Sequence, residues 1–507
     1  MKNYKHVFPC NKKNILIWFV FLFIFSSNSL VGAVEKRNKS HNRLKANSVN
    51  HYSKPRTTRS ATQPNIIFIL TDDLDKISIP SMPKLKSKLI DQGMSFDNFV
   101  ASTPVCCPSR ATLLTGRYSH NTGIKTNQLP DGGFAKFYNS GQESSTIATW
   151  LQGAGYETVL IGKYLNSPTE AAYPTYIPPG WNQWYGQTFD KFYYNYQLNE
   201  NGTLVDYGNS AEHYSTKVFT DKAINFIQNR SSAAQPFFIY LNLHAPHDNA
   251  YHEAQYKPFA LTEIFPRIPS FNEEDVSDKP LYIQERAQFL PTVIERIDRV
   301  YRNRLRSLQS VDDAIQRIDE VLAATGNSKN TYIFFSSDNG FHQGQHRLKH
   351  GKGSPYEEDI LLPFIVRGPR VPRGVSVQQL VGTTDIAPTL ATLANAPIPS
   401  FVDGRSFVRI LHGVTPTNWR KSYLLENWPK QLAPFYGIRT QDYSYIEHDT
   451  NEYELYDLKN DPYQLNNIYS TLSPTVIRQL SNRLKSLKSC TASNCRLIEG
   501  RSVPPLL

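Results

Sequence analysis

Two pairs of oxygen-bearing residues each follow an apolar run of strand length. Asp72 and Asp73 close the first run, and Asp338 and Asn339 close a later one. Three carboxylates and one amide oxygen suit a hard divalent cation such as calcium or magnesium, and disfavour zinc. Each pair alone has a structural alternative, since Asp-Asp caps helices and Asp-Asn-Gly forms turns. Together, the pairs predict a cation site if the fold brings them to one place.

Two further apolar runs end in residues suited to anion binding or proton transfer. Lys163 follows residues 158–161, and His244 and His247 follow residues 237–243. In open α/β sheets, ligand sites gather at the carboxyl ends of the strands. Four runs with polar ends therefore favour one shared site over four unrelated caps or turns.

The elements that must position these residues are strands alternating with helices. The runs are rich in Ile, Val and aromatic residues, as buried parallel strands are, and residues 363–366 form a fifth run of this kind. Apolar residues spaced by three or four from Leu305 to Leu322 predict a helix that stops at Gly326. The pattern predicts an α/β fold with a large mixed, mostly parallel sheet between helices.

Toward the C-terminus the pattern changes to short strands, such as residues 443–446, followed by a turn at 460–462 and a last helix at about 474–488. We therefore expect a catalytic α/β domain at residues 64–400. A smaller α+β subdomain is expected at residues 401–507.

The charge of the chain is concentrated at its N-terminus. The 507 residues include 55 Lys and Arg against 44 Asp and Glu, for a formal net charge of +11. Residues 1–63 hold twelve of the basic residues and one acidic residue, which leaves 43 of each sign elsewhere. A neutral body argues against a nucleic-acid partner, because neutralising phosphates requires clustered excess cations. With 40% hydrophobic and 20% charged residues, the composition is that of a globular protein.

The N-terminal residues follow the pattern of a secretory signal peptide. Lysines precede an apolar stretch of 11 residues at 15–25, which is shorter than the roughly 20 residues of a membrane-spanning helix. We predict a signal peptide at residues 1–33 and no stable membrane span, with a signal anchor extending through Val34 as the alternative. Residues 34–63 predict a basic disordered linker, either a solvated tail or one attracted to anionic matrix or lipid. The expected location is the secretory pathway: secreted or lysosomal, or periplasmic if the source is bacterial.

Other features fit an oxidising compartment. Cys490 and Cys495 enclose four residues and are candidates for a small surface disulfide. Asn38, Asn201 and Asn229 each begin an Asn-x-Ser/Thr sequon and are candidates for glycosylation.

Cys106 and Cys107 are adjacent and therefore poor partners for a mutual disulfide. They open the stretch Cys-Cys-Pro-Ser-Arg-Ala-Thr-Leu-Leu-Thr-Gly-Arg, which resembles the signature of the type I sulfatase family on the alkaline-phosphatase-like fold. The resemblance implies that a formylglycine-generating enzyme oxidises Cys106 to formylglycine (3-oxoalanine). The structural alternative is a buried Cys-Cys pair before a proline turn.

The resemblance also implies a mechanism. One hydroxyl of the hydrated aldehyde attacks sulfur beside the metal and displaces the substrate alcohol, and the other then collapses the adduct and expels sulfate. Arg110, one helical turn after Cys106, would stabilise the hydrated aldehyde. The implied metal ligands are Asp72, Asp73, the modified Cys106, Asp338 and Asn339.

Further matches to the family imply the remaining roles. Lys163 and Lys352 would bind the sulfate, and His247 would bind sulfate and protonate the leaving oxygen. His244 is expected to be structural. Many family members have His where this chain has Leu165, so Asn166 is a candidate replacement for that contact.

His342 is a candidate for lining the substrate pocket, with a structural role as the alternative. Gln464 stands where family members commonly have Glu. The segments at 176–181 and 193–202 look most like the N-acetylglucosamine-6-sulfatase branch, which implies sulfated glycosaminoglycan sugars as substrate. The alternatives are an arylsulfatase acting on another substrate, a phosphomonoester or phosphonate hydrolase on the same fold, and an inactive glycan-binding protein.

Overall fold

The computed structural model describes residues 63–167, 174–188, 193–230, 235–429 and 432–506. Residues 61–507 form one compact unit. The predicted signal peptide, nearly all of the predicted linker and the sequon at Asn38 lie outside the described residues. Within the described part of the chain, no helix has both the length and the apolar character needed to span a membrane.

The strands of the described residues form sheets of ten, two and four strands. The large sheet has the order β11-β2-β10-β9-β1-β8-β4-β5-β6-β7, and its central strands β9, β1, β8, β4 and β5 are parallel. The strands are β1 (Asn65–Thr71), β2 (Met94–Phe96), β3 (Phe99–Val100), β4 (Glu157–Gly162), β5 (Gln183–Gln187), β6 (Tyr196–Glu200), β7 (Thr203–Tyr207), β8 (Phe237–Asn242), β9 (Thr331–Ser337), β10 (Phe364–Arg367), β11 (Val375–Val377), β12 (Val381–Gly382), β13 (Tyr423–Asn427), β14 (Phe435–Arg439), β15 (Tyr443–His448) and β16 (Tyr453–Asp457).

One strand runs opposite to the direction predicted for it. β10 is antiparallel to both β9 and β2, so the expectation of a parallel strand at residues 363–366 is wrong. The chain leaves the carboxyl end of β9 and re-enters the sheet at that same end after residues 338–363, without a helical crossover over a face of the sheet. A return of this kind gives an antiparallel neighbour.

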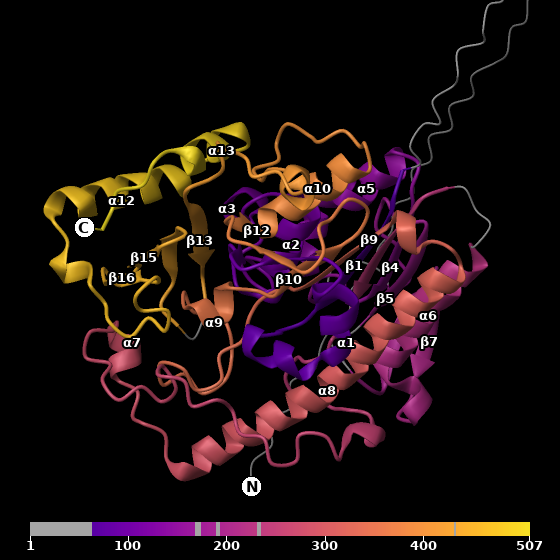
Figure 1. The fold of residues 1–507 in the computed structure, drawn as a ribbon, viewed down its shortest axis with the longest axis horizontal. Helices are drawn as coiled ribbons and strands as arrows, with labels where there is room; N and C mark the ends of the chain where they lie inside the picture. Colours follow the sequence, from indigo (N-terminus) through magenta and orange to yellow (C-terminus); the bar gives the residue numbers. More distant parts are fainter. Residues whose placement is uncertain (1–62, 168–173, 189–192, 231–234, 430–431, 507) are drawn as a thin grey trace, which may run out of the picture. The chain divides into compact units, whose positions relative to one another are not determined.

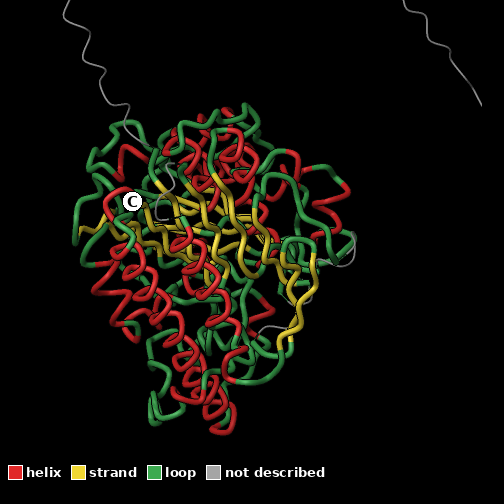
Figure 2. Tube along the Cα trace, turned by 90° about the vertical axis from the view of Figure 1, so that its right-hand side faces the viewer, coloured by secondary structure: helices red, strands yellow, loops and turns green. Residues whose placement is uncertain are grey.

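Helices cover both faces of the large sheet, as predicted (Figures 1 and 2). The α-helices are α1 (Pro83–Leu85), α2 (Cys106–Thr115), α3 (Ser119–Thr122), α4 (Gly133–Asn139), α5 (Ile147–Gly153), α6 (Ser215–Asn229), α7 (Leu281–Gln284), α8 (Pro291–Ala324), α9 (Glu357–Ile360), α10 (Ile386–Leu393), α11 (Val408–Leu411), α12 (Pro474–Leu487) and α13 (Ser493–Gly500). α8 contains the helix predicted between Leu305 and Leu322 and extends beyond it at both ends.

The two faces of the sheet have separate hydrophobic cores because side chains alternate along each strand. On β1, Ile67 and Ile69 pack in the core that holds apolar residues of α6 and α8. Ile66 and Phe68 of the same strand pack in the core beneath α2, α5 and α10. The central strand is therefore buried on both sides, and the polar residues that follow it are held at a rigid edge.

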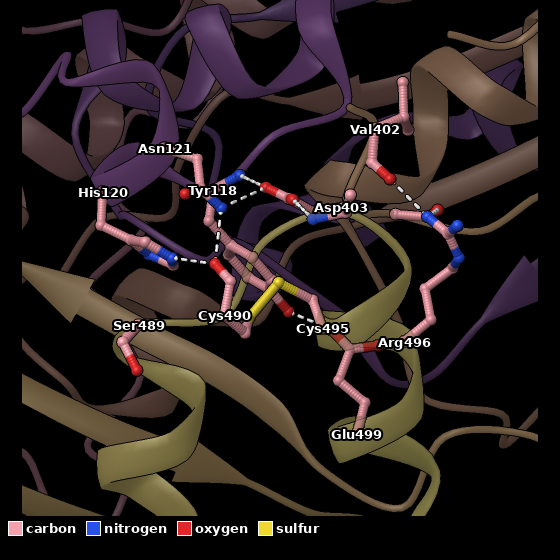
Figure 3. The surroundings of a disulfide bond; sticks show 12 residues. Tyr118, His120, Asn121, Val402, Asp403, Ser489, Cys490, Cys495, Arg496 and Glu499 are labelled. Atoms are coloured by element: carbon pink, nitrogen blue, oxygen red, sulfur yellow. Dashed lines mark hydrogen bonds between the residues drawn. A yellow bond between two sulfur atoms is a disulfide. The ribbon is translucent and has the colours of Figure 1, made fainter. Parts of the chain in front are cut away.

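The C-terminal part contains the antiparallel sheet β13–β16, which packs with α12 and α13 in a third core. The structure joins Cys490 to Cys495 in a disulfide, as predicted (Figure 3). Both cysteines are buried in the third core, so the expectation of a surface position is wrong. The carbonyl oxygen of Cys490 accepts a hydrogen bond from Asn121 Nδ2 at 2.9 Å and lies 2.9 Å from His120 Nε2. This part is thus attached to α3, which follows α2. The boundary at residue 400 stays a prediction.

Candidate active site

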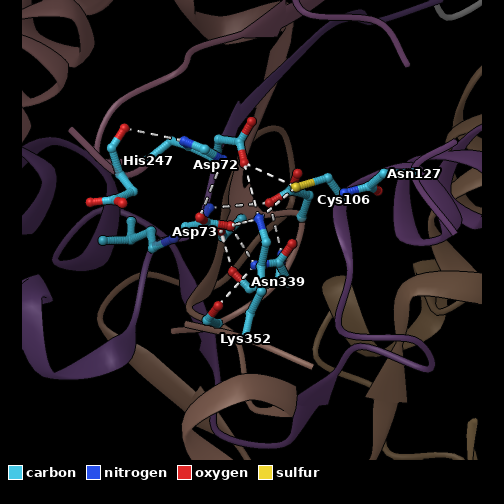
Figure 4. A network of polar contacts seen from close by, with 12 residues as sticks. Asp72, Asp73, Cys106, Asn127, His247, Asn339 and Lys352 are labelled. Atoms are coloured by element: carbon cyan, nitrogen blue, oxygen red, sulfur yellow. Dashed lines mark hydrogen bonds and ion pairs between the residues drawn. The ribbon is translucent and has the colours of Figure 1, made fainter. Parts of the chain in front are cut away.

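The carboxyl ends of four adjacent strands meet at one edge of the large sheet, as the sequence pattern indicated. They carry Asp72 and Asp73 after β1, Lys163 after β4, His244 and His247 after β8, and Asp338 and Asn339 after β9. Cys106 and Lys352 reach the same place from outside the sheet (Figure 4). The structure therefore brings together the residues predicted for metal binding and catalysis.

Cys106 is the first residue of α2, and its side chain points into this cluster. Its Sγ–H donates to Asp72 Oδ1 at 3.4 Å, and Lys352 Nζ donates to Sγ at 2.7 Å. Burial raises the pKa of the Cys106 thiol well above its usual value, and Asp72 adds to the rise, so the unmodified side chain is a neutral thiol. Cys107 instead packs in the apolar core beneath α2.

Arg110 lies one helical turn after Cys106 and is completely buried. Its Nε donates to Asp338 Oδ2 at 2.8 Å, and its other nitrogens donate to the Lys163 carbonyl at 3.0 Å and to Asp72 Oδ2 at 3.4 Å. Burial alone would lower the pKa of Arg110, but Asp338 and Asp72 raise it above its usual value. The guanidinium is therefore a fixed positive charge that joins three strand ends to α2.

Lys163 is held by the glycine before it. Gly162 has φ +98, and a Cβ there would lie 2.0 Å from the carbonyl oxygen of Asn242 on the neighbouring β8. Only glycine allows the chain to turn at this point and direct Lys163 into the site. Lys163 Nζ lies 2.5 Å from Asp72 Oδ2. Burial opposes its charge, but Asp72, Cys106 and Asp338 together outweigh burial and raise the pKa of Lys163.

Lys352 and His247 are the most accessible members of the cluster, with side chains 18% and 20% exposed. Lys352 Nζ pairs with Asp73 Oδ1, and His247 Nε2 lies 3.6 Å from Asp73 Oδ2. Burial works against the charge of Lys352, but Asp73, Cys106 and Asp72 together override it and raise the pKa of Lys352 well above its usual value. These two side chains are placed to meet a ligand that enters from solvent.

The oxygen atoms of Asp72, Asp73 and Asn339 fit a hard divalent cation, whereas the Cys106 thiol and the His247 imidazole are softer ligands. Ligand atoms of Asp72, Asp73, Cys106 and His247 all lie within 4.8 Å of one another. The Oδ1 atom of Asn339 is buried and has no hydrogen-bond partner among the described residues, while its Nδ2 donates to Asp73 Oδ1 at 2.7 Å. A buried amide oxygen that accepts no hydrogen bond and lies beside two carboxylates is a suitable ligand for a cation.

The lowered pKa values of Asp72 and Asp73 agree with this fit, whereas burial and the nearby Asp72 raise the pKa of Asp338. Burial would raise the pKa of Asp72, but Lys163, His247 and Arg110 together hold it well below its usual value. Asp338 is less free to ligate, because its Oδ1 accepts from the backbone of Asp73 at 3.2 Å and Asn339 at 2.9 Å, while its Oδ2 accepts from Arg110.

A cavity of about 670 Å³ lies beside the cluster, and Val105 and Lys352 are in its wall. His342 lines it too, with Nδ1 held 2.9 Å from Asp359 Oδ2. Asn166 lies elsewhere: its carbonyl accepts from Phe134 N at 2.8 Å, and it is not among the described residues that line the cavity. Leu165 packs in the core beneath α2.

The cavity wall also contains residues that the sequence pattern did not single out. Asn127 accepts from the backbone N–H of Cys107 at 2.9 Å and so fixes the start of α2. Asn427, the last residue of β13, donates to the carbonyl of Gly353, next to Lys352. Asn427 lies at the end of a strand, like the predicted residues, and its position in the sequence could have indicated it. Asn127 lies in a loop, where no sequence pattern could have done so.

Comparison with protein families gives a match to the sulfatase family over residues 64–396 and to the C-terminal domain of N-sulphoglucosamine sulphohydrolase over residues 344–490. The chain is 31% identical to human N-acetylglucosamine-6-sulfatase, covering 86% of both chains. It is 32% identical to an arylsulfatase of Volvox carteri, covering 85% of this chain and 76% of that one. A putative extracellular sulfatase homologue of Caenorhabditis elegans is 36% identical over 72% of this chain and 52% of its own length.

Solved structures agree with these matches. One, a protein in complex with its substrate D-glucosamine-2-N,6-O-disulfate, superposes with a TM-score of 0.72 at 25% identity, covering 86% of this chain and 99% of that one. A phosphonate monoester hydrolase of Silicibacter pomeroyi superposes with a TM-score of 0.65 at 22% identity, covering 83% and 93%. The second likeness shows the fold alone.

Proposed function

The chain belongs to the sulfatase family, and we propose that this sulfuric ester hydrolase removes sulfate from sulfated glycans, with N-acetylglucosamine 6-sulfate as its preferred unit. The observation that carries the proposal is the position of Cys106. It starts α2 with Sγ 3.4 Å from Asp72 and 2.7 Å from Lys352. The choice of this sugar is supported by the names of the N-acetylglucosamine-6-sulfatase relatives and by the substrate bound in the similar solved structure.

The proposed cofactors are formylglycine made from Cys106 and one calcium ion. Asp72, Asp73 and Asn339 would hold the ion, with Asp338 and the modified Cys106 as the remaining ligands. When present, the two groups supply a hydroxyl nucleophile on carbon and positive charge beside it. The neutral, deeply buried thiol agrees with this proposal, because an unmodified Cys106 would be a poor nucleophile.

The side chains of the protein have separate tasks in this proposal. Lys163 and Lys352 bind the sulfate oxygens and stabilise negative charge as it develops. Arg110 keeps the start of α2 in register with the carboxylates through its bond to Asp338. His247, at the accessible side of the cluster, donates a proton to the leaving sugar oxygen.

The proposed location is the secretory pathway, with residues 1–33 as signal peptide and the protein secreted or lysosomal. The name of the extracellular sulfatase relative supports this setting. Asn201 and Asn229 are both exposed, as glycosylation acceptors must be. The disulfide between Cys490 and Cys495 suits the same oxidising environment.

The test is a comparison of three substrates on one preparation of the enzyme: N-acetylglucosamine 6-sulfate, an aryl sulfate and an aryl phosphonate. The proposal predicts the highest kcat/KM on the sulfated sugar. Activity on the aryl sulfate alone would instead favour an arylsulfatase with another natural substrate. A preference for the phosphonate would favour the phosphonate hydrolase, and binding of the sulfated sugar without turnover would favour an inactive glycan-binding protein.

A further inference from the structure

Another buried arginine lies against the active site, on the face of the sheet opposite to Arg110. Arg304 belongs to α8 and is completely buried. Its guanidinium carbon lies 4.1 Å from the centre of the Phe341 ring, two residues after the proposed ligand Asn339. The proposed chemistry gives Arg304 no task, yet a buried charge is costly unless the fold supplies partners for it. Its partners therefore show what it holds in place.

The guanidinium of Arg304 spans two loops of the active site. Its Nη1 donates to the carbonyl of Pro246 at 2.9 Å, in the loop that carries His247. Its Nη2 donates to the carbonyl of Asp73, a proposed ligand of the cation, and to Asp75 Oδ2 at 2.8 Å. Because both nitrogens belong to one rigid planar fork, the fork fixes the spacing between the two loops.

A second side chain holds the His247 loop from another direction. Tyr193 is buried, and its hydroxyl donates to the carbonyl of His247 at 2.8 Å. The Tyr193 ring stacks on that of Tyr214 at a centroid distance of 5.9 Å, which fixes the direction of the hydroxyl. Two consecutive carbonyls of the loop, those of Pro246 and His247, are therefore held by side chains from outside it.

The imidazole of His247 depends on the position of this backbone. Its Nε2 lies 3.6 Å from Asp73 Oδ2, at the accessible side of the cluster. A proton donor works only within hydrogen-bond reach of the leaving oxygen, and a displacement of about 1 Å can lower a rate about a hundredfold. Because a shift of the backbone carries the imidazole with it, the groups that fix the two carbonyls also fix the proton donor.

We propose that Arg304 and Tyr193 are positioning residues, which hold the His247 loop so that its imidazole meets the leaving oxygen at a fixed distance from Asp73. Both are buried and act through His247 rather than on the substrate. This inference rests on the proposed function, in which His247 gives a proton to the leaving oxygen as the bond between that oxygen and sulfur breaks.

The test uses two aryl sulfates whose leaving oxygens differ in their need for a proton. 4-Nitrophenolate leaves readily as an anion, whereas the more basic phenolate gains more from a proton donor. The readout is the ratio of kcat/KM on 4-nitrophenyl sulfate to kcat/KM on phenyl sulfate. Because both values come from one preparation, the ratio does not depend on how much of a variant is folded.

The variants remove one contact at a time. Tyr193→Phe deletes only the hydroxyl, and Arg304→Lys replaces the fork with a single nitrogen that cannot reach both loops. The ratio should rise at least about threefold in Tyr193→Phe and at least about tenfold in Arg304→Lys, because activity on phenyl sulfate falls more. Arg304→Gln, which keeps a neutral donor for one carbonyl, is the second variant at this position if the lysine variant does not fold.

Arg306→Lys is the matched control. Arg306 lies on the same helix and donates to the carbonyl of Phe259 at 2.8 Å, and Phe259 is not among the site residues. This variant should leave the ratio unchanged.

Double variants show whether the two residues act through His247. His247→Ala should itself raise the ratio, and Tyr193→Phe or Arg304→Lys should raise it no further in that background. A further rise there would overturn the inference, because the two residues would then act on the active site in general.

The single variants separate this inference from the proposed function. An unchanged ratio in Tyr193→Phe and in the Arg304 variants would overturn the positioning role and leave the proposed function intact. If His247→Ala keeps the ratio of the wild type, His247 is not the proton donor of the proposed function, and the inference fails with it.

Discussion

Arg110 and Asp338 form a completely buried ion pair, with Nε 2.8 Å from Oδ2. Arg110 belongs to the helix that starts at Cys106, and Asp338 follows the central strand β9. The pair therefore fixes the helix that carries the proposed nucleophile against the strand ends that carry the proposed metal ligands. The pair therefore contributes both to the stability of the fold and to the geometry of the proposed active site.

Replacing Arg110 with Gln should lower the free energy of unfolding by about 3–5 kcal/mol, because Asp338 would keep a buried charge without its partner. Urea unfolding measures the change. Arg478 is exposed on α12, so Arg478→Gln is the matched control and should leave stability within about 0.5 kcal/mol. Equal stabilities for the two variants would show that the Arg110–Asp338 pair does not hold the site together.

Lys163→Ala and Lys352→Ala should each reduce kcat by about a hundredfold, because each removes one positive charge from the place where negative charge develops. Steady-state kinetics on an aryl sulfate measures the effect. Lys459→Ala, at an exposed position, is the control and should retain full activity. A change in KM alone for the two site lysines would contradict a role in the chemical step.

Gly162→Ala should destabilise the protein by about 2 kcal/mol or more and remove most activity. The new Cβ would lie 2.0 Å from the Asn242 carbonyl, at a φ of +98, so Lys163 would have to move. Gly153→Ala is the matched control: Gly153 ends α5 and has open space around the position of a Cβ. The melting temperature and the activity of the two variants are measured. A Gly162→Ala variant with the stability and activity of the wild type would contradict this account of how Lys163 is placed.

Treatment with a chelator should abolish activity and lower the melting temperature, and calcium should restore both. Asp73→Asn should raise the calcium concentration needed for half-maximal activity by about tenfold or more, because it removes a charged ligand. Asp206→Asn, at an exposed acid on β7, should not change it. Full activity after complete removal of divalent ions would contradict the cation site.

The sequence was enough to predict the residues at the strand ends. Asp72, Lys163, His247 and Asp338 all follow apolar runs, and the carboxyl ends of parallel strands meet at one edge of the sheet. The direction of β10 could not be predicted, since a four-residue apolar run looks the same in either direction. The antiparallel return depends on the path of the loop before it.

His342 was predicted to line the cavity and does, but much of the rest of the cavity wall was beyond the sequence pattern. Lys125, Asn127 and Trp428 lie in connecting segments, where no periodicity indicates which side chains meet. Trp428 follows a strand of the C-terminal sheet, and its contact with Lys125 joins positions 303 residues apart. Contacts of this kind depend on how the two parts of the chain pack, which local patterns do not encode.

Conversion of Cys106 to formylglycine can be measured by mass spectrometry of the tryptic peptide 89–110 from active, natively produced enzyme. Trypsin should release this peptide by cleaving after Lys88 and after Arg110. It contains Cys107 as an internal control that should remain a thiol. We expect Cys106 to have lost sulfur and two hydrogens and gained one oxygen, with fragment ions placing the change at that residue. An unmodified thiol at Cys106 in fully active enzyme would contradict this expectation.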